Sequence, residues 1–178
     1  MQLIPTEIPD VQVIRPKVFE DSRGFFFESY NVKSLSAFGF NHQFVQDNHS
    51  RSRKNVLRGL HYQIQQPQGK LVRVVAGEIF DVAVDIRRDS TSFGKCVSRI
   101  LSSENHEMLW IPAGFAHGFV VLSESADMVY KTTDYYAPQL ERTIVWNDPD
   151  LAIDWPVSRD LIISDKDLRG SLFRDSEL

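Results

Sequence analysis

Residues 71–86, L-V-R-V-V-A-G-E-I-F-D-V-A-V-D-I, carry the pattern that decides the fold class. A β-rich run up to Val75 is followed by turn residues at 76–78 and then by a second run. In the second run, apolar residues alternate with a mostly charged set: Phe80, Val82, Val84 and Ile86 against Asp81, Ala83, Asp85 and Arg87. A period of two predicts a half-buried β-strand.

Similar runs recur along the chain between turn residues. We expect strands at Val11 to Ile14, Phe25 to Tyr30, Phe44 to His49, Leu57 to Ile64, Cys96 to Leu101, Met108 to Ile111, Phe119 to Leu122, Met128 to Tyr135 and Thr143 to Trp146. Short strands at this spacing predict a mainly β sandwich or barrel. Helix is scarce, and the last few residues are expected to be loose.

Two short helices are predicted from their ends. Asn31 should cap a helix that reaches Phe38, with Gly39 ending it, and a second helix should follow Ser164. No repeat, low-complexity tract or linker interrupts the chain. We therefore expect one domain over residues 1–178.

The composition limits the class of protein. The chain has 178 residues, of which 42% are hydrophobic and 25% charged, and a formal net charge of -4. A negative balance argues against a general nucleic-acid binder. Cys96 is the single cysteine, which excludes an intrachain disulfide and a cysteine-based metal site. With no apparent signal peptide or membrane span, a cytoplasmic protein without a membrane partner is expected.

Two segments carry candidate chemistry. The spacing P-x-G-x-x-H in I-P-A-G-F-A-H-G-F (111–119) resembles the second cupin motif, in which a turn delivers a histidine into the mouth of a small barrel. The segment V-L-R-G-L-H-Y-Q (56–63) lies where the first cupin motif is expected. There Gln63 takes the place of a second histidine, so His61 and His117 are not expected to hold a metal. Each histidine alone equally suits a satisfied polar group in the lumen.

Cations and tyrosines add to this pattern. Tyr130 and Tyr136 lie six residues apart in one β-rich run, and alternation would place both on one face. Either could equally be a core aromatic. Four cations, each of which alone suits a solvated surface, would bind a diphosphate if they converged on a barrel mouth: Arg23, Arg58, Lys70 and Lys166.

Eight segments in order resemble the dTDP-4-dehydrorhamnose 3,5-epimerase family over nearly the whole chain. They are D-S-R-G-F-F-F-E (21–28), Q-D-N-H-S (46–50), L-R-G-L-H-Y-Q (57–63), Q-G-K-L-V-R (68–73), I-P-A-G-F-A-H-G-F (111–119), Y-K-T-T-D-Y-Y-A-P (130–138), E-R-T-I-V-W-N-D-P (141–149) and S-D-K-D (164–167). The resemblance implies a cupin-type antiparallel β-barrel (jelly roll) with a few short helices, and a homodimer.

The resemblance also implies a role for each matched residue. His61 matches the general base, Asp167 the carboxylate that orients it, Tyr130 the proton donor on the opposite face of the sugar, and Lys70 a cation near the keto oxygen. Tyr136 matches the aromatic residue that stacks on thymine. The other matched positions correspond to nucleotide-sugar contacts: Arg23, Glu28, Gln46, Asn48, Arg58, His117, Glu141 and Lys166.

Three local expectations concern backbone geometry. Strict alternation places Arg58 and His61 on opposite faces, so both serve one site only if Gly59 permits a bulge or if Arg58 comes from a neighbouring subunit. Asp47 should point away from the site by alternation. Many relatives have a glycine near Asn55, and asparagine tolerates the left-handed backbone that a glycine there would adopt.

The chemistry fits these residue types. In a 4-keto-hexose, the hydrogens on C3 and C5 are both α to the carbonyl, so inversion needs a base, an acid on the other face and donors at the oxygen. The expected substrate is a dTDP-4-keto-6-deoxyhexose. No cofactor is expected, because the ketone itself is the electron sink, and a G-x-G-x-x-G fingerprint is absent.

Three alternatives remain open at this point. The nearest is a relative that performs part of the chemistry, such as a 3-epimerase, a 5-epimerase or a 3,4-ketoisomerase. A second is a non-catalytic cupin that binds a nucleotide sugar, which loss of His61, Tyr130 or Asp167 would have favoured. A metal-dependent cupin dioxygenase or isomerase is the third, and it lacks the expected ligands.

Overall fold

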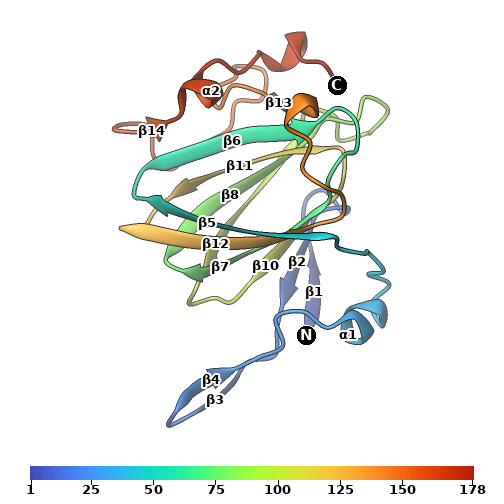
Figure 1. Ribbon diagram of the computed structural model, residues 1–178, viewed down its shortest axis with the longest axis vertical. Coiled ribbons are helices and arrows are strands. Elements are labelled where there is room, and N and C mark those ends of the chain that lie inside the picture. The colour runs from blue at the N-terminus through green and yellow to red at the C-terminus, as the bar shows by residue number, and fades with distance from the viewer.

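Two antiparallel sheets lie face to face in the computed structural model, which describes residues 1–178 (Figure 1). The β7 sheet contains, in spatial order, β1 (Gln2–Pro5), β2 (Gln12–Arg15), β10 (Met108–Ile111), β7 (Lys70–Ala76), β12 (Ser125–Thr132) and β5 (Gln46–Arg53). The β8 sheet contains β13 (Glu141–Thr143), β6 (Val56–Gln63), β11 (Phe115–Val121), β8 (Glu78–Asp85) and β9 (Cys96–Ser102).

Short elements complete the fold. β14 (Ile162–Ile163) adds to β6 in parallel, and β3 (Phe19–Asp21) and β4 (Gly24–Phe26) form a separate hairpin. The helical elements are α1 (Val32–Ser36), η1 (Pro138–Leu140), α2 (Asp165–Leu168) and η2 (Phe173–Asp175). The predicted architecture, mainly β with a few short helices, is confirmed. None of the helices has the length and apolar character needed to cross a membrane.

From β5 to β8, and again from β9 to β13, strands that follow one another in sequence lie in different sheets. The predicted turn at 76–78 joins β7 to β8 and carries the chain from one sheet to the other. Gly77 has φ +77°, and a Cβ there would lie 2.1 Å from the Ser125 carbonyl oxygen, so the turn requires glycine. Asn55 turns β5 into β6 at φ 62°, as its tolerance of the left-handed region predicted.

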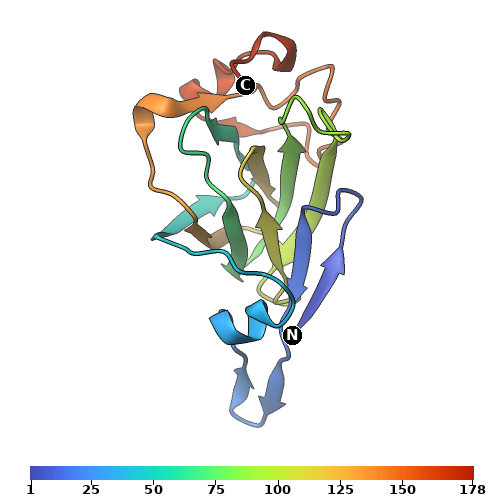
Figure 2. The ribbon, with the colours of Figure 1, turned by 90° about the vertical axis from the view of Figure 1, so that its right-hand side faces the viewer.

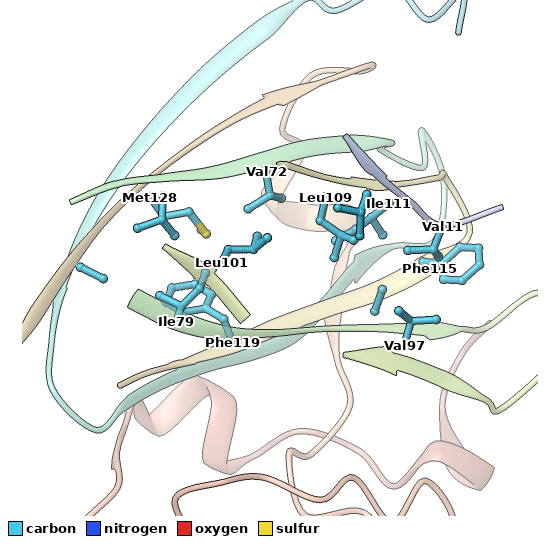
Figure 3. Close-up of a cluster of buried hydrophobic side chains, with 14 of the residues drawn as sticks. Val11, Val72, Ile79, Val97, Leu101, Leu109, Ile111, Phe115, Phe119 and Met128 are labelled. Atoms are coloured by element: carbon cyan, nitrogen blue, oxygen red, sulfur yellow. The ribbon is translucent and has the colours of Figure 1, made fainter. Parts of the chain in front are cut away.

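The main core fills the space between the two sheets. Figure 3 shows Val72 and Met128 of the β7 sheet pointing toward Ile79, Leu101 and Phe119 of the β8 sheet. A second cluster, with Leu151 and Trp155, packs the C-terminal segment on the outer side of the β8 sheet. Each large apolar side chain buried in this way contributes about 1.5–3 kcal/mol.

The prediction of a half-buried strand in residues 80–86 is wrong, because β8 is buried on both faces. Val82 and Val84 belong to the cluster under the C-terminal segment, which covers the side that would otherwise meet solvent. Ala83 belongs to the core between the sheets, and Asp81 and Asp85 are also fully buried. Their carboxylates are tolerated because His117 and Arg87, respectively, bind them.

Most predicted strands are recovered with shifted ends, but the run from Thr143 to Trp146 shares only Thr143 with β13. The run from Phe25 to Tyr30 is wrong beyond Phe26, because the chain leaves the hairpin there. The run from Met128 to Tyr135 begins earlier and ends at Thr132. β1, β3 and β14 were not predicted. They have four, three and two residues, respectively, which is too short for a clear alternation of apolar and polar residues.

Both predicted helices are present with the predicted N-caps, but α1 ends at Ser36 with Ala37 as its C-cap, two residues before the predicted end at Phe38. The Asn31 side chain accepts a hydrogen bond from the Ser34 amide, and the Ser164 hydroxyl accepts one from the Asp167 amide. The expectation of a loose C-terminus is wrong. Tyr62 donates a hydrogen bond to the Glu177 carbonyl oxygen, and Ser176 is buried, so the final residues are held against the β8 sheet.

The core makes one stability prediction on strand β9. Leu101 is fully buried between the sheets, whereas the adjacent Ile100 is 47% exposed on the other face. Leu101→Ala should lower the free energy of unfolding by about 2–5 kcal/mol, because it leaves a cavity. The matched control Ile100→Ala should change it by about 0.5 kcal/mol or less. Urea denaturation measures both, and equal losses would contradict this placement of the core.

Candidate active site

Polar side chains from both sheets gather around one end of the space between them. A small cavity there is lined by His61 and Gln63 of β6, Lys70 of β7, Tyr136 of the loop after β12, and Glu141 at the start of β13. Phe115 and Ile86 give it an apolar wall. The structure thus brings together residues that lie about eighty positions apart in the sequence.

His61 forms a close pair with Asp167. The His61 Nε2 atom lies 2.6 Å from the Asp167 carboxylate, whose side chain is only 4% exposed. Since the carboxylate accepts a hydrogen bond, Nε2 carries the proton and Nδ1 keeps its lone pair. The pair therefore presents Nδ1 as a base, with an anion behind the ring to stabilise the imidazolium that proton uptake creates.

Helix α2 positions Asp167. The helix begins with a Ser164 cap, and Asp167 in its first turn also accepts a hydrogen bond from the Gly59 amide at 3.3 Å. Burial alone would raise the pKa of Asp167, but the His61 hydrogen bond and charge hold it below its usual range. Asp167 is therefore ionised near neutral pH.

Gly59 resolves the conflict between Arg58 and His61. In the pairing of β6 with β11, His61 lies opposite His117 and Arg58 opposite Phe119, so β6 holds one extra residue. This bulge is one of the two solutions that the sequence allowed. It turns Arg58 toward β5, where its Nε donates to the Ser52 hydroxyl at 3.0 Å. Gly59 has φ +110°, and a Cβ would lie 2.5 Å from the Gly118 Cα atom.

Tyr130 approaches from the opposite wall. It lies on β12 in the β7 sheet, whereas His61 lies on β6 in the β8 sheet (Figure 1). Burial and the nearby Glu141 charge raise the pKa of Tyr130, with Arg58 partly opposing them. Its phenol therefore keeps its proton at neutral pH and can act as an acid.

Lys70 is a cation without a partner inside the chain. Its ammonium group makes no hydrogen bond to protein atoms and lines the same cavity as His61. Burial lowers the pKa of Lys70 to about 8, while the carboxylates of Glu141 and Asp81 partly oppose this shift. A cation that is already desolvated and unpaired is suited to bind a developing oxyanion.

Glu141 connects several of the predicted contact residues. Its carboxylate accepts hydrogen bonds from the Tyr136 hydroxyl, at 2.9 Å, and from Lys166. Burial would raise the pKa of Glu141, but Lys166, His61 and Tyr136 together lower it. Gln46 extends the network, because its amide oxygen accepts from the Tyr136 backbone and its nitrogen donates to Asn48.

Tyr136 reaches this network in an unexpected way. The alternation of Tyr130 and Tyr136 on one strand is wrong, since β12 ends at Thr132 and Tyr136 lies in the loop that follows. The loop returns Tyr136 to the site through its hydrogen bond to Glu141. Asp47 points outward and pairs with Lys131, as alternation predicted.

Arg23 and Glu28 are not brought to this site within the chain. Arg23 is 88% exposed and pairs with Asp21 in its own hairpin, and Glu28 accepts a hydrogen bond from Asn31. Figures 1 and 2 show the β3–β4 hairpin projecting from the end of the molecule opposite α2, which carries Asp167. The remaining predicted residue, His117, lies directly across from His61.

Sequence reasoning missed three supporting residues. Asp81 binds His117, Ser52 binds Arg58, and Gln63 accepts from the Ala137 amide and donates to the Gln66 carbonyl. The alternation of Asp81 with valines indicated that it lies on the opposite face of the strand from them. Its charge, however, suggested that this face meets solvent rather than the lumen. No group of three or more histidine, cysteine or carboxylate side chains is placed to hold a metal ion.

The two facing antiparallel sheets, with a histidine–carboxylate pair on one wall, define a class, the cupin-type β-barrels. A family model described as dTDP-4-dehydrorhamnose 3,5-epimerase matches residues 5–175. The chain belongs to this family.

Individual relatives are similar over nearly their whole length. The dTDP-4-dehydrorhamnose 3,5-epimerase of Pseudomonas aeruginosa is 61% identical over 171 residues, covering 96% of this chain and 94% of the relative. The enzyme of the same name from Shigella flexneri is 57% identical over 179 residues, covering 99% and 98%. A crystal structure of dTDP-6-deoxy-D-glucose-3,5-epimerase from Legionella pneumophila Philadelphia 1, in complex with dTDP-4-keto-L-rhamnose, has a TM-score of 0.94 and 55% identity, covering 97% and 93%.

The surroundings of Lys70 predict its titration. In protein labelled with 13C-lysine, the Lys70 ε-carbon signal, assigned with Lys70→Arg, should titrate with a pKa of about 8, below the ordinary value for lysine. Glu141→Gln should lower this pKa further, because it removes a carboxylate that favours the ammonium form. A Lys70 midpoint at the ordinary lysine value would contradict the desolvated environment.

Proposed function

We propose that this chain is a dTDP-4-dehydrorhamnose 3,5-epimerase. It converts dTDP-4-keto-6-deoxy-D-glucose to dTDP-4-keto-L-rhamnose by enolisation and reprotonation at C3 and C5, a step of L-rhamnose biosynthesis. The observation that carries the proposal is the placement of a base, His61, and an acid, Tyr130, on opposite sheets of one barrel. A sugar ring between them is accessible to the base on one face and to the acid on the other.

The first step is proton removal by His61. Nδ1 takes the proton from the carbon next to the ketone, and the imidazolium that forms is stabilised by Asp167, which holds Nε2 at 2.6 Å. The electron pair of the broken C–H bond moves into the ring and leaves negative charge on the C4 oxygen. Because the ketone accepts this charge, the proposal needs no cofactor.

Lys70 and Tyr130 complete the inversion. The unpaired ammonium of Lys70 binds the C4 oxyanion, in a cavity where desolvation strengthens the interaction. Tyr130 then donates its phenolic proton to the opposite face of the carbon, and the ketone re-forms. Before the second inversion, His61 releases its proton to solvent and the Tyr130 phenolate takes one up, which restores the base and the acid. The same groups then act once at C3 and once at C5, because both carbons are adjacent to the one carbonyl.

The remaining residues contact the nucleotide sugar. Tyr136, half-exposed beside Gln46, stacks on the thymine base. Cations around the entrance bind the diphosphate through charge-assisted hydrogen bonds, with polar side chains completing the contacts: Arg23, Glu28, Gln46, Asn48, Arg58, His117, Glu141 and Lys166.

The two faces of the sugar can be tested separately with two variants. In deuterium oxide, His61→Asn should lower both deuterium uptake and inversion by about 10²–10⁴-fold, because the base is lost. Tyr130→Phe should lower inversion by a similar factor but keep more of the uptake, because His61 can return a deuteron to the face it left. Proton NMR of the sugar measures both, and equal loss of the two activities in Tyr130→Phe would exclude Tyr130 as the acid.

We further propose that the chain works as a cytoplasmic homodimer with one domain over residues 1–178. The lone thiol of Cys96 fits a reducing compartment. Phe19, Phe25 and Phe26 of the β3–β4 hairpin are each more than half exposed, an arrangement typical of an interaction surface. The hairpin that carries Arg23 lies away from its own site, which fits a role in the site of a second copy.

Mixed dimers test whether Arg23 acts in the neighbouring subunit. His61→Ala and Arg23→Ala are each expected to be weakly active alone. If Arg23 acts across the dimer, co-expression should restore about a quarter of wild-type activity, because half of the molecules are mixed and each has one complete site. Light scattering confirms the dimer. Activity that stays at the level of the separate variants would place Arg23 in its own subunit's site.

A further inference from the structure

A second carboxylate–histidine pair lies in the lumen beside the first. His117 on β11 has its Nε2 atom 2.9 and 3.0 Å from the two carboxylate oxygens of Asp81 on β8. The Asp81 side chain is fully buried, and His117 is 7% exposed. His117 is the only side chain that hydrogen-bonds to this carboxylate. A buried carboxylate with one partner fixes that partner strongly, because no water is available to replace it.

The register of the β8 sheet places this pair next to His61. His117 is paired directly with His61 across β11 and β6, and residues paired in this way extend from the same face of a sheet. On the other side, His117 pairs with Ala83, which belongs to the core between the sheets. The two imidazole rings are therefore neighbours on the lumen wall, each supported from behind by its own carboxylate.

The other ring nitrogen of His117 is open. Nδ1 makes no hydrogen bond within the chain. It is also not fully buried, because the hydroxyl of Ser50 is the one fully buried polar side-chain atom that lacks a partner. The Nδ1 edge of His117 therefore keeps some exposed surface and is not closed off by protein atoms. With the proton on Nε2, which donates to Asp81, this edge carries a lone pair and accepts hydrogen bonds.

We propose that Asp81 is a positioning residue that holds His117 as the Nε2–H tautomer, with Nδ1 accepting a hydrogen bond from a hydroxyl group of the hexose. This inference rests on the proposed function, in which the hexose lies between His61 and Tyr130. A hydroxyl held at His117, beside the base, fixes the rotation of the ring and so aims the C–H bond at His61. Small errors in such alignment are costly for proton transfer.

A double-mutant cycle tests whether Asp81 acts through His117. Asp81→Asn and His117→Asn should each lower kcat/KM by about 10–100-fold, the usual effect of losing a supporting partner of an active-site histidine. Adding Asp81→Asn to His117→Asn should have little further effect, because its target is gone. Independent, multiplying losses would overturn the proposal. The matched control is Glu107→Gln, which alters a buried carboxylate held by Arg15 and Arg99 and should leave kcat/KM unchanged.

Asp81→Asn has a second effect on activity, through Lys70, which must be separated from its effect through His117. The charge of Asp81 also supports the ammonium form of Lys70, so the variant should lower the pKa of Lys70 as well. Each variant is therefore compared on the plateau of its own pH profile, below the alkaline fall in activity. On that plateau Lys70 is charged, and only the effect through His117 remains.

NMR of the histidine rings tests the proposal without turnover. In protein labelled with 15N-histidine, the His117 signals, assigned with His117→Asn, should show a protonated Nε2 and an unprotonated Nδ1 in the neutral ring. Asp81→Asn should reduce this preference. A wild-type ring with its proton on Nδ1 would overturn the proposal even if the epimerase activity is present. The predicted tautomer without turnover of the 4-keto sugar would instead count against the proposed function alone.

Discussion

The hydrogen bond between His61 and Asp167 joins two parts of the chain 106 residues apart, strand β6 and helix α2. Because Asp167 is buried, it depends on the partners that the fold supplies, namely the His61 ring and the Gly59 amide. Gly59 in turn adopts the positive-φ backbone of the bulge that separates His61, opposite His117, from Arg58, which binds Ser52. The C-terminal segment is thus both the outer cover of the β8 sheet and the source of the carboxylate that binds His61.

The division of the barrel into two sheets separates the side chains to which we assign the base and the acid. The β8 sheet carries both histidines, each supported by a buried carboxylate, whereas the β7 sheet carries Lys70 and Tyr130. The core between the sheets fixes their spacing, since it packs side chains from both walls. Burial shifts Tyr130 and Lys70 in opposite directions on the pKa scale, so the phenol keeps its proton while the ammonium becomes easier to deprotonate.

Much of this could be predicted from the sequence where local patterns and motifs coincide. The strand runs, both helix caps, the turn at Gly77 and the candidates His61, Lys70, Tyr130 and Asp167 follow from the residues or from the family motifs. The inward direction of Asp81 could not be predicted, because a charged residue alternating with valines normally faces solvent. The valines of β8 are buried on the outer side of the sheet only because the C-terminal segment, more than sixty positions away, covers them. This leaves Asp81 on the inner side.

The position of Arg23 and Glu28 could not be predicted for another reason. Their motif matches the family, yet the hairpin that carries Arg23 packs little against its own barrel (Figure 2). Sequence similarity transfers a role to a residue without stating which subunit it serves. The structure shows only that Arg23 and Glu28 lie away from the other predicted site residues of their own chain, and the proposed dimer is what would bring them to a site.

The most direct test of the account is proton exchange in the wild-type protein with dTDP-4-keto-6-deoxy-D-glucose in deuterium oxide, without added metal or nicotinamide. Enolisation by one base beside a shared ketone predicts deuterium at both C3 and C5 of an inverted sugar, seen by proton NMR. Deuterium at one carbon only would contradict the double inversion and indicate a single epimerase. No deuterium at either carbon would contradict the assignment of His61 as the base for this substrate.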